Sequence, residues 1–332
     1  MKKNLLAMAI AGVCGIAIVP AASAVSLYEN ANGDYVSLNG RIEVGGYFGK
    51  SHTDRGDEYT HYQGFADDSF GDLAFNARSG DVYGLLDIDF ERQSWTADNQ
   101  FQIVLDKFYV GWEFLDGHFV ELGRNDTAYD DVSDLGDFSI DGAVSISDAG
   151  DQDNTIKYFG SFGQWIAGIS YSLDGWDNYK TDSREEWVLN GYVGYAADNW
   201  TVLAGAETSK EYGDHLSLHG EYRLNELSLG GLVALFDSED ENAHISSDHV
   251  LAVLSAGYQI TDAIELVATY SHINFDEEYT YVENGKLKKQ VSDNWVTAGV
   301  RYAHTDNVTL AAEILTGSKE ESYGYGKVYF RF

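Results

Sequence analysis

A long run of carboxylates without a single base lies near the middle of this sequence. Nine aspartates fall between residues 125 and 154, a stretch that has no lysine or arginine: Asp126, Asp130, Asp131, Asp134, Asp137, Asp141, Asp148, Asp151 and Asp153. Carboxylates in this number attract cations, whereas catalysis needs a nucleophile or an acid–base pair in a defined arrangement. No nucleophile-centred motif accompanies these residues, so the sequence predicts no catalytic residues.

Four bases are the candidates to face this acidic stretch. Arg41, Lys107 and Lys157 each stand as the lone base in a row of polar or aromatic residues, and Arg124 lies at the root of the acidic stretch. Acids on one side of a water-filled passage and bases on the other would create a transverse field, which orients dipolar solutes and admits small polar ones. The alternative for each base is an ordinary salt-bridged or snorkelling wall residue.

Period-2 alternation in segments of about ten residues predicts the strands that would position these side chains. From residue 35 to 44 the aliphatic side chains Val36 and Ile42 share one face, and Arg41 falls on the other. From residue 215 to 224 the same pattern separates Leu216 from Ser217. Such strands have one oily and one polar face.

The connections between these strands alternate in length. Seven are short turns, at 79–81, 115–117, 163–164, 197–199, 225–226, 261–262 and 305–307. Eight are long and polar, at 49–67, 96–102, 125–154, 174–185, 208–214, 237–248, 274–291 and 317–322. The sequence therefore predicts an all-β fold, a transmembrane antiparallel barrel of sixteen strands with short periplasmic turns and long extracellular loops. A soluble β-sandwich or propeller is the alternative.

Composition excludes several classes. The formal net charge is -33, from 54 acids against 21 bases, which repels phosphate backbones and excludes nucleic acid as a partner. Aromatic residues make up 14% of the chain, too much apolar area for a disordered acidic protein. After residue 24 no apolar run approaches the roughly 20 residues that a membrane helix requires. A barrel reconciles these facts, because half of every strand faces water inside.

Residues 1–24 have the features of a cleaved secretory signal peptide. Two lysines precede an apolar stretch, and Ala22-Ser23-Ala24 supplies the small-residue cleavage site. An uncleaved membrane anchor is the alternative. Removal would take with it the only cysteine, Cys14, and leave residues 25–332 as one barrel. We therefore expect export to the outer membrane, and stability without disulfides.

The stretch 125–154 is the longest connection, and long ordered loops are usually functional. We expect this third loop to fold inward and narrow the lumen, with Leu135, Phe138 and Ile140 packing against the wall. The alternative is a solvated acidic loop outside the barrel.

Two segments resemble a known family. Phe108-Tyr109-Val110-Gly111-Trp112 and the stretch from Phe119 to Asp131 are similar to the fourth and fifth strands and constriction loop of general trimeric porins of Gram-negative outer membranes. The terminal Phe332 resembles the assembly signal of that family. The resemblance implies a homotrimer of sixteen-stranded barrels that passes small hydrophilic solutes.

By this resemblance Arg41, Lys107 and Lys157 match basic positions of the pore constriction, and Asp137 and Asp141 match acidic ones. The proline-containing turn of the family's loop is missing, and the second strand lacks its usual base. The arginine cluster is therefore depleted.

Ten further acids fall on the lumen side of the predicted strands, so we expect a cation-selective diffusion channel. They are Glu43, Asp87, Asp89, Glu91, Glu113, Glu186, Glu207, Glu221, Glu265 and Glu313. The alternative is an oligosaccharide-selective porin, in which lumen aromatics form a stacking track: Tyr35, Tyr47, Tyr109, Tyr192, Trp295 and Tyr325. We expect lipid and lipopolysaccharide as neighbours, no cofactor and no metal site, because no spacing matches a calcium loop.

Overall fold

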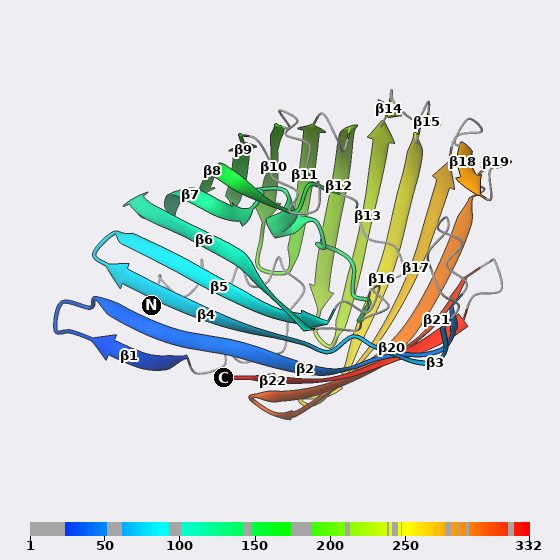
Figure 1. Ribbon diagram of the computed structural model, residues 1–332, viewed down its shortest axis with the longest axis horizontal. Coiled ribbons are helices and arrows are strands. Elements are labelled where there is room, and N and C mark those ends of the chain that lie inside the picture. The colour runs from blue at the N-terminus through cyan, green and yellow to red at the C-terminus, as the bar shows by residue number, and fades with distance from the viewer. Residues whose placement is uncertain are drawn as a thin grey trace.

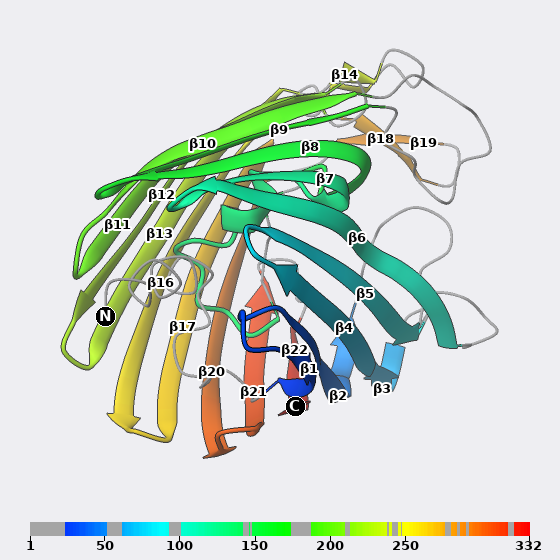
Figure 2. The ribbon, with the colours of Figure 1, turned by 90° about the vertical axis from the view of Figure 1, so that its left-hand side faces the viewer.

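Strands of this chain pair edge to edge into one closed sheet (Figures 1 and 2). The computed structural model describes residues 24–51, 62–92, 101–141, 146, 148–173, 187–209, 213–237, 239–240, 245–246, 248–275, 280–283, 286–289, 292–317 and 322–332. Its elements are β1 (Val25–Glu29), β2 (Tyr35–Ser51), β3 (Tyr62–Asp67), β4 (Phe70–Ser79), β5 (Val82–Arg92), β6 (Phe101–Leu115), β7 (His118–Asp126), the 3-10 turn η1 (Asp130–Val132), β8 (Asp151–Phe162), β9 (Trp165–Ser172), β10 (Val188–Ala196), β11 (Trp200–Ser209), β12 (Gly213–Leu224), β13 (Leu227–Asp237), β14 (Glu239–Asp240), β15 (Ile245–Ser246), β16 (His249–Thr261), β17 (Ile264–Phe275), β18 (Thr280–Glu283), β19 (Lys286–Lys289), β20 (Asp293–Thr305), β21 (Val308–Gly317) and β22 (Ser322–Arg331).

Antiparallel neighbours follow one another around the wall, and β2 pairs with β22 to close it, from Arg41 opposite Arg331 to Lys50 opposite Ser322. Within the described residues the main sheet has 18 strands. β1 is a short arm on β2, and β3 and β4 lie end to end along β2, so sixteen strand positions form the barrel. The predicted sixteen-stranded barrel is confirmed.

Two features of the first strands differ from the prediction. β1 forms a hairpin with β2, and Val25 pairs with Leu38 just below the point where Phe332 meets Gly40, so β1 continues the track of β22. The predicted loop at 49–67 is too long, because β2 runs to Ser51 and β3 fills 62–67. The sequence of β3 mixes polar and apolar residues without a period of two, so alternation does not predict this strand.

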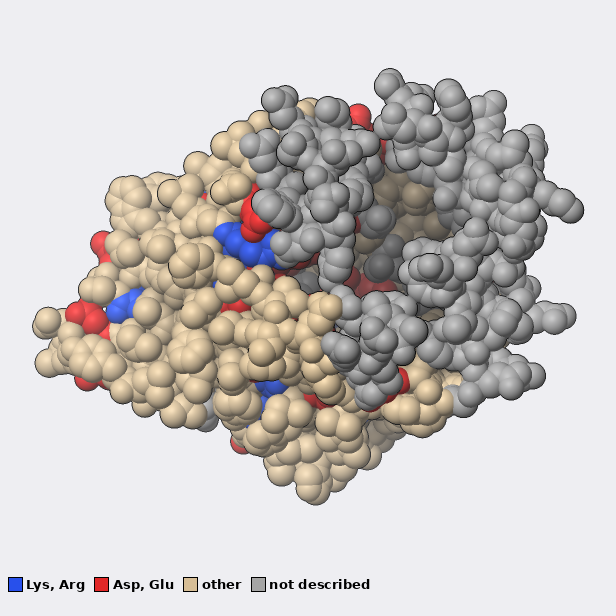
Figure 3. All heavy atoms as spheres, in the orientation of Figure 1, with Lys and Arg blue, Asp and Glu red and all other residues tan. Residues whose placement is uncertain are grey.

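The two faces of each strand separate as predicted. Leu216 and Leu218 on β12 are each 56% exposed on the outside, whereas Ser217 and His219 between them are 3% and 1% exposed. Figure 3 shows that the described part of one outer face is mostly uncharged. In a barrel whose apolar side chains point outward, water and polar groups occupy the inside.

The seven predicted short turns fall between the expected strand pairs, all at one end of the barrel. Tyr222, Tyr258 and Tyr302 lie exposed near these turns, as an aromatic belt at a membrane interface requires. No helix among the described residues is long and apolar enough to cross a membrane. The predicted leader, residues 1–24, lies outside the described residues except for Ala24.

Candidate functional site

Between β7 and β8, the described residues 127–141, 146 and 148–150 lie inside the ring of strands (Figure 2). We call this segment the inner loop; β7 and β8 extend into both ends of the predicted 125–154 stretch. Its backbone N–H groups donate to wall hydroxyls: Ala128 to Ser170 Oγ on β9 at 2.8 Å, and Phe138 to Ser255 Oγ on β16 at 3.2 Å. The inner loop therefore follows the inner wall from strand to strand.

Tyr129 anchors the start of the inner loop. Its side chain is fully buried, its hydroxyl donates to Ser217 Oγ at 2.6 Å, and His219 Nε2 lies 3.1 Å from the same hydroxyl. The ring lies against Gly205 of β11, where an added Cβ would stand 2.1 Å from it. A larger residue at position 205 would displace the ring, so the close packing of Tyr129 on the wall requires a glycine there.

Gly136 makes the closest backbone approach to the wall. It has φ +94, a conformation that residues with a Cβ rarely adopt. A Cβ there would stand 2.7 Å from the carbonyl oxygen of Gly231 and 2.8 Å from that of Gly220. Glycines on both sides of this contact let main chain pack on main chain.

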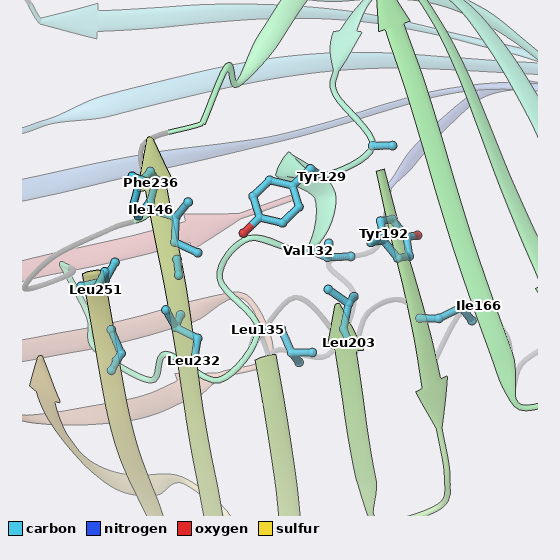
Figure 4. Packing of buried hydrophobic residues seen from close by; sticks show 13 residues of the cluster. Tyr129, Val132, Leu135, Ile146, Ile166, Tyr192, Leu203, Leu232, Phe236 and Leu251 are labelled. Carbon is cyan, nitrogen blue, oxygen red and sulfur yellow. The ribbon is translucent and has the colours of Figure 1, made fainter. Parts of the chain in front are cut away.

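Apolar side chains of the inner loop pack onto an apolar patch of the lumen wall (Figure 4). Leu135 is fully buried and Phe138 is 7% exposed. The Cδ1 atom of Ile140 reaches the space above Gly299 of β20. The cluster comprises Ala128, Tyr129, Val132, Leu135, Ile146, Ile166, Tyr192, Leu203, Leu232, Ala234, Phe236, Leu251 and Val253. The three side chains predicted to pack the loop to the wall all do so.

Two charged wall residues, Glu313 and Arg301, form hydrogen bonds to the main chain of the inner loop; we call this pair the clamp. The Glu313 carboxylate on β21 accepts the N–H groups of Ile140 and Asp141, both at 3.2 Å. The Arg301 guanidinium on β20 donates to the carbonyl oxygens of Phe138 and Ser139, both at 3.0 Å. Sequence reasoning placed Glu313 in the lumen but missed Arg301 and the clamp, because these pairs are separated by more than 160 residues.

The predicted loop acids have different surroundings. Asp137 Oδ1 accepts from Thr269 Oγ1 at 3.3 Å, and Asp134 is exposed. Asp141 Oδ1 accepts from the Tyr47 hydroxyl at 2.8 Å, and burial raises the pKa of Asp141 to about 7. Burial, then the nearby carboxylate of Asp148, raises the pKa of Asp130 well above its usual range.

Arg41 pairs with wall carboxylates. Its Nε donates to Asp72 on β4, and its Nη1 lies 3.3 Å from Glu43 on β2. Glu43 is shared with Lys327 of β22 at 2.8 Å, and Lys327 also binds Asp68 at 2.9 Å. Lys327 is a lumen base that sequence reasoning missed, although its alternating position on the last strand could have identified it.

Lys107 and Lys157 each contact one of the predicted acids. Lys107 Nζ lies 3.1 Å from Asp126, at the end of β7. Lys157 Nζ lies 3.0 Å from Asp131 on the inner loop and 3.4 Å from Glu121 on the wall. Burial raises the pKa of Asp131 to about 6 even though Lys157 opposes that shift.

Arg124 pairs with Asp151 and with Asp153, the latter at 3.1 Å, and donates to the carbonyl oxygen of Leu105 at 2.8 Å. Its partners lie on β8 and β6, outside the inner loop. Of the four predicted bases, only Lys157 therefore contacts an acid of the inner loop itself. Lys107 and Arg124 pair with acids of the predicted 125–154 stretch that lie on β7 and β8, and Arg41 pairs within the wall.

Acids outnumber bases on the same wall. Asp87 and Asp89 of β5 point into the lumen, and neither forms an ion pair within the described part of the chain. Asp89 lies directly opposite Asp72 in the β4–β5 register. Among the residues that the structure describes, no three histidines, cysteines or acids gather to hold a metal ion. The arrangement is a water-facing, net acidic lining.

Comparison with known proteins shows which family this chain belongs to. A family model described as Gram-negative porin matches residues 7–321. Two Halomonas proteins are each 26% identical over 281 residues, which are 73% of this chain and 72% of theirs. One is named a monosaccharide porin, from a Halomonas species, and the other the major outer membrane protein of Halomonas elongata.

Solved structures share the fold at low identity. Salmonella typhi OmpF, solved with daunomycin, has a TM-score of 0.69 at 14% identity, covering 93% of this chain and 100% of that one. The anion-selective porin of Comamonas acidovorans has a TM-score of 0.65 at 16% identity, and the trimer form of Vibrio cholerae OmpT 0.65 at 15% identity. Both matches cover 90% of this chain and 99% of the other.

Proposed function

Because the chain belongs to the Gram-negative porin family, and is thus an outer-membrane channel and not an enzyme, we propose that it passes small hydrophilic solutes by passive diffusion and prefers cations. The fold alone leaves the charge preference open, since an anion-selective porin has the same fold. The preference must come from the charges that line this lumen.

One observation supports the preference for cations most strongly. The predicted bases Arg41, Lys107, Arg124 and Lys157 are each neutralised by carboxylates. Asp87 and Asp89 keep no such partner within the described residues, and the chain carries 54 acids against 21 bases. A permeating cation therefore meets a negative potential, which raises its local concentration.

The inner loop is proposed as the constriction. It occupies part of the lumen, and its exposed Asp134 and the paired Asp131 face the passage beside the wall that bears Lys157. In this role Asp126, Asp130, Asp137 and Asp141 hold the loop in place or add negative charge. The four predicted bases offset part of the negative charge of the wall. The shape of the opening then depends on how firmly the loop is held.

A homotrimer in the outer membrane is proposed as the assembly. The trimer form of Vibrio cholerae OmpT supports this, and the outer face of β6 is apolar, with Ile103 72% and Phe108 60% exposed. Apolar outer faces of this kind suit either lipid or a neighbouring barrel. A trimer that survives mild detergent and falls to one-third of its mass on heating supports the assembly, and a single-chain mass throughout contradicts it.

A second candidate function is favoured by one relative's name, monosaccharide porin. Tyr47 is half-buried and stands 5.4 Å from Tyr323 and 5.0 Å from Tyr325, ring centre to ring centre. Tyr192 and Tyr325, both part of the predicted stacking track, are 8% and 5% exposed and leave little ring surface for a sugar. Saturable block of the ion current by one monosaccharide, and not by its isomers, would favour this reading.

The reversal potential in a KCl gradient across a planar bilayer tests the main proposal. We expect the sign set by potassium. A chloride-dominated potential would overturn the preference for cations, and an absence of single-channel steps from correctly folded protein would overturn the channel itself. A mass-matched outer-membrane preparation without the protein serves as the control.

A further inference from the structure

One base in the lumen departs from the pattern set by the others. The structure describes the side chains of nine lysines and arginines, and eight of them form ion pairs with carboxylates: Arg41, Arg78, Lys107, Arg124, Lys157, Arg223, Arg301 and Lys327. The ninth is Arg331. In the described part of the chain, no carboxylate, the terminal one at Phe332 included, lies within 4.0 Å of its guanidinium.

Arg331 points into the lumen at the short-turn end. On β22 the alternate residues Val328 and Phe330 are 42% and 41% exposed on the outer face, which puts Arg331 on the inner one. Its main-chain N–H donates to the carbonyl oxygen of Asn307, in the turn between β20 and β21. The guanidinium therefore lies near the periplasmic mouth of the passage.

The placement of Arg331 breaks a rule of sheet pairing. It lies directly opposite Arg41 in the β2–β22 register, and like charges directly opposite each other destabilise a sheet. Arg41 forms ion pairs with Asp72 and Glu43, whereas Arg331 forms none within the described residues: the Tyr329 ring lies 5.5 Å from its guanidinium carbon, and Glu43 and Asp72 act on it only at longer range. Local rules broken without compensation mark functional positions in proteins.

We propose that Arg331 and Tyr329 form a subsite for the carboxylate group of small solutes in transit. A guanidinium over an aromatic face keeps its N–H edges free, and the fork of those edges matches a carboxylate with two parallel hydrogen bonds. Among the lysines and arginines whose side chains the structure describes, Arg331 is the one that no carboxylate pairs with, so an anionic group can gain a direct contact there.

The subsite rests on the proposed channel function and refines it. Cations are drawn by the acids of the lining, and a solute that also carries a carboxylate gains a second contact at Arg331. Charged hydroxy acids and zwitterions would therefore dwell longer than uncharged solutes of the same size. A dwelling solute obstructs the ion current, which makes the subsite measurable.

The test is obstruction of the single-channel KCl current by sodium D-gluconate, with D-glucitol as the uncharged counterpart of the same chain length. In the wild-type channel we expect gluconate to obstruct at lower concentration than glucitol, and more strongly from the short-turn side. R331Q should raise the half-obstructing concentration of gluconate about tenfold, which corresponds to about 1.4 kcal/mol for a charge-assisted contact. The half-obstructing concentration of glucitol should be the same in the wild-type and R331Q channels.

R78Q is the matched control, since Arg78 lies near the same mouth but is paired with Glu113. It removes the same charge, and we expect a change of less than about twofold because the paired guanidinium offers no free fork. R331K keeps the charge and loses the fork, and we expect an intermediate loss. If R331Q does not insert into bilayers, R331K against the wild type decides the question.

Three results would overturn the subsite: equal obstruction by gluconate and glucitol in the wild type, unchanged gluconate obstruction in R331Q, or an equal loss in R78Q, which would mean that only the overall lumen charge matters. These results are separable from failure of the proposed function. A chloride-type reversal potential with intact gluconate obstruction would refute the preference for cations and leave the subsite standing.

Discussion

The two sides of the lumen wall are built differently. From β9 to β21 the wall is covered by the inner loop and meets it mainly through hydroxyls, glycines and aliphatic side chains such as Ser217, Leu203 and Leu251, all at most 3% exposed. From β2 to β8 the wall carries most of the ion pairs, such as Arg41 with Asp72, and meets the inner loop through Tyr47 with Asp141 and Lys157 with Asp131. The β9–β21 side thus holds the inner loop mainly through neutral contacts, and the β2–β8 side is the one along which we expect ions to pass.

This difference shows how a porin keeps a fixed opening beside a mobile stream of ions. Neutral hydrogen bonds and apolar packing do not respond to salt, so the covered side holds the loop at any ionic strength. Exposed ion pairs are screened and exchange partners readily. Most of the ion pairs therefore lie on the side where we expect solutes to pass, while Arg301, Glu313 and Glu207 on the other side bind main-chain groups of the inner loop.

The largest expected effect is on the covered side, at Gly136. Gly136→Ala adds a Cβ that overlaps two carbonyl oxygens of the wall at 2.7 and 2.8 Å, so we expect the loop to leave its seat and the single-channel conductance to rise. Gly150→Ala is the matched control: this loop glycine also has a positive φ, +57, but nothing lies within 4 Å of an added Cβ. Both variants bear backbone strain of about 1–3 kcal/mol, and only the first adds the overlap. Equal conductance in both variants would refute the close main-chain seat.

A smaller effect on the same side is expected from Glu313→Gln. The amide places an N–H donor against one of the two loop N–H groups that the carboxylate accepts, at a cost of about 1–3 kcal/mol. We expect noisier current steps and faster proteolysis of the inner loop. Glu265→Gln is the control, because Glu265 binds Arg301 without touching the loop main chain. Quiet currents in Glu313→Gln would show that the clamp is dispensable.

On the β2–β8 side, neutralising the unpaired acids should weaken the preference for cations while the loop stays in place. For Asp87→Asn with Asp89→Asn we expect the potassium-to-chloride permeability ratio to fall about two- to threefold, a modest change because water and salt screen the charges. Asp262→Asn, in the turn between β16 and β17, removes an acid outside the passage and should leave the ratio unchanged. A fall of the same size in this control would assign selectivity to the surface instead.

The smallest effect is a pH dependence of loop docking. The pKa of Asp141 is about 7 and that of Asp131 about 6 in the docked loop, both raised mainly by burial from an ordinary value near 3.8. The docked loop thus binds these protons more tightly than a released one, so docking is favoured at low pH and weakens as pH rises from about 4 to about 7; the raised pKa of Asp130 extends the loss to higher pH. We expect current noise to rise over that window.

Asp141→Asn should remove the part of this dependence that comes from Asp141, since the amide cannot ionise and still accepts from the Tyr47 hydroxyl. The charged groups around Asp141 are Asp68, Glu313 and Lys327. Noise that falls between pH 4 and pH 7 in the wild type would contradict the sign.

Most of the barrel follows from the sequence, because an alternation of period 2 is local and needs no partner to be visible. Leu216 and Ser217 reveal their faces by position alone. The strand count and the inward loop followed from the same pattern, and Leu135 and Phe138 from their apolar type. β1 escaped prediction because its five residues are exposed on every side.

The partners of the site residues could not be predicted, since they depend on register between distant strands. Arg124 finds Asp151 and Asp153 only because β8 returns beside β7, and the bulge between Asp87 and Ile88 on β5 shifts the neighbouring β6 by one residue. No local pattern encodes the contact of Glu313 with Ile140, because the two residues are 173 positions apart in the sequence.

The accessibility of two loop positions tests the docked inner loop most directly. The only cysteine of the chain is Cys14, in the predicted leader, so a thiol introduced into the barrel stands alone. Asp134 is exposed to the lumen, whereas Val132, two residues earlier, is 4% exposed against the wall. With Asp134→Cys we expect a cationic methanethiosulfonate reagent to react within seconds and reduce the potassium current, and with Val132→Cys we expect almost no reaction. Equal rates at the two positions would show that the loop does not lie on the wall.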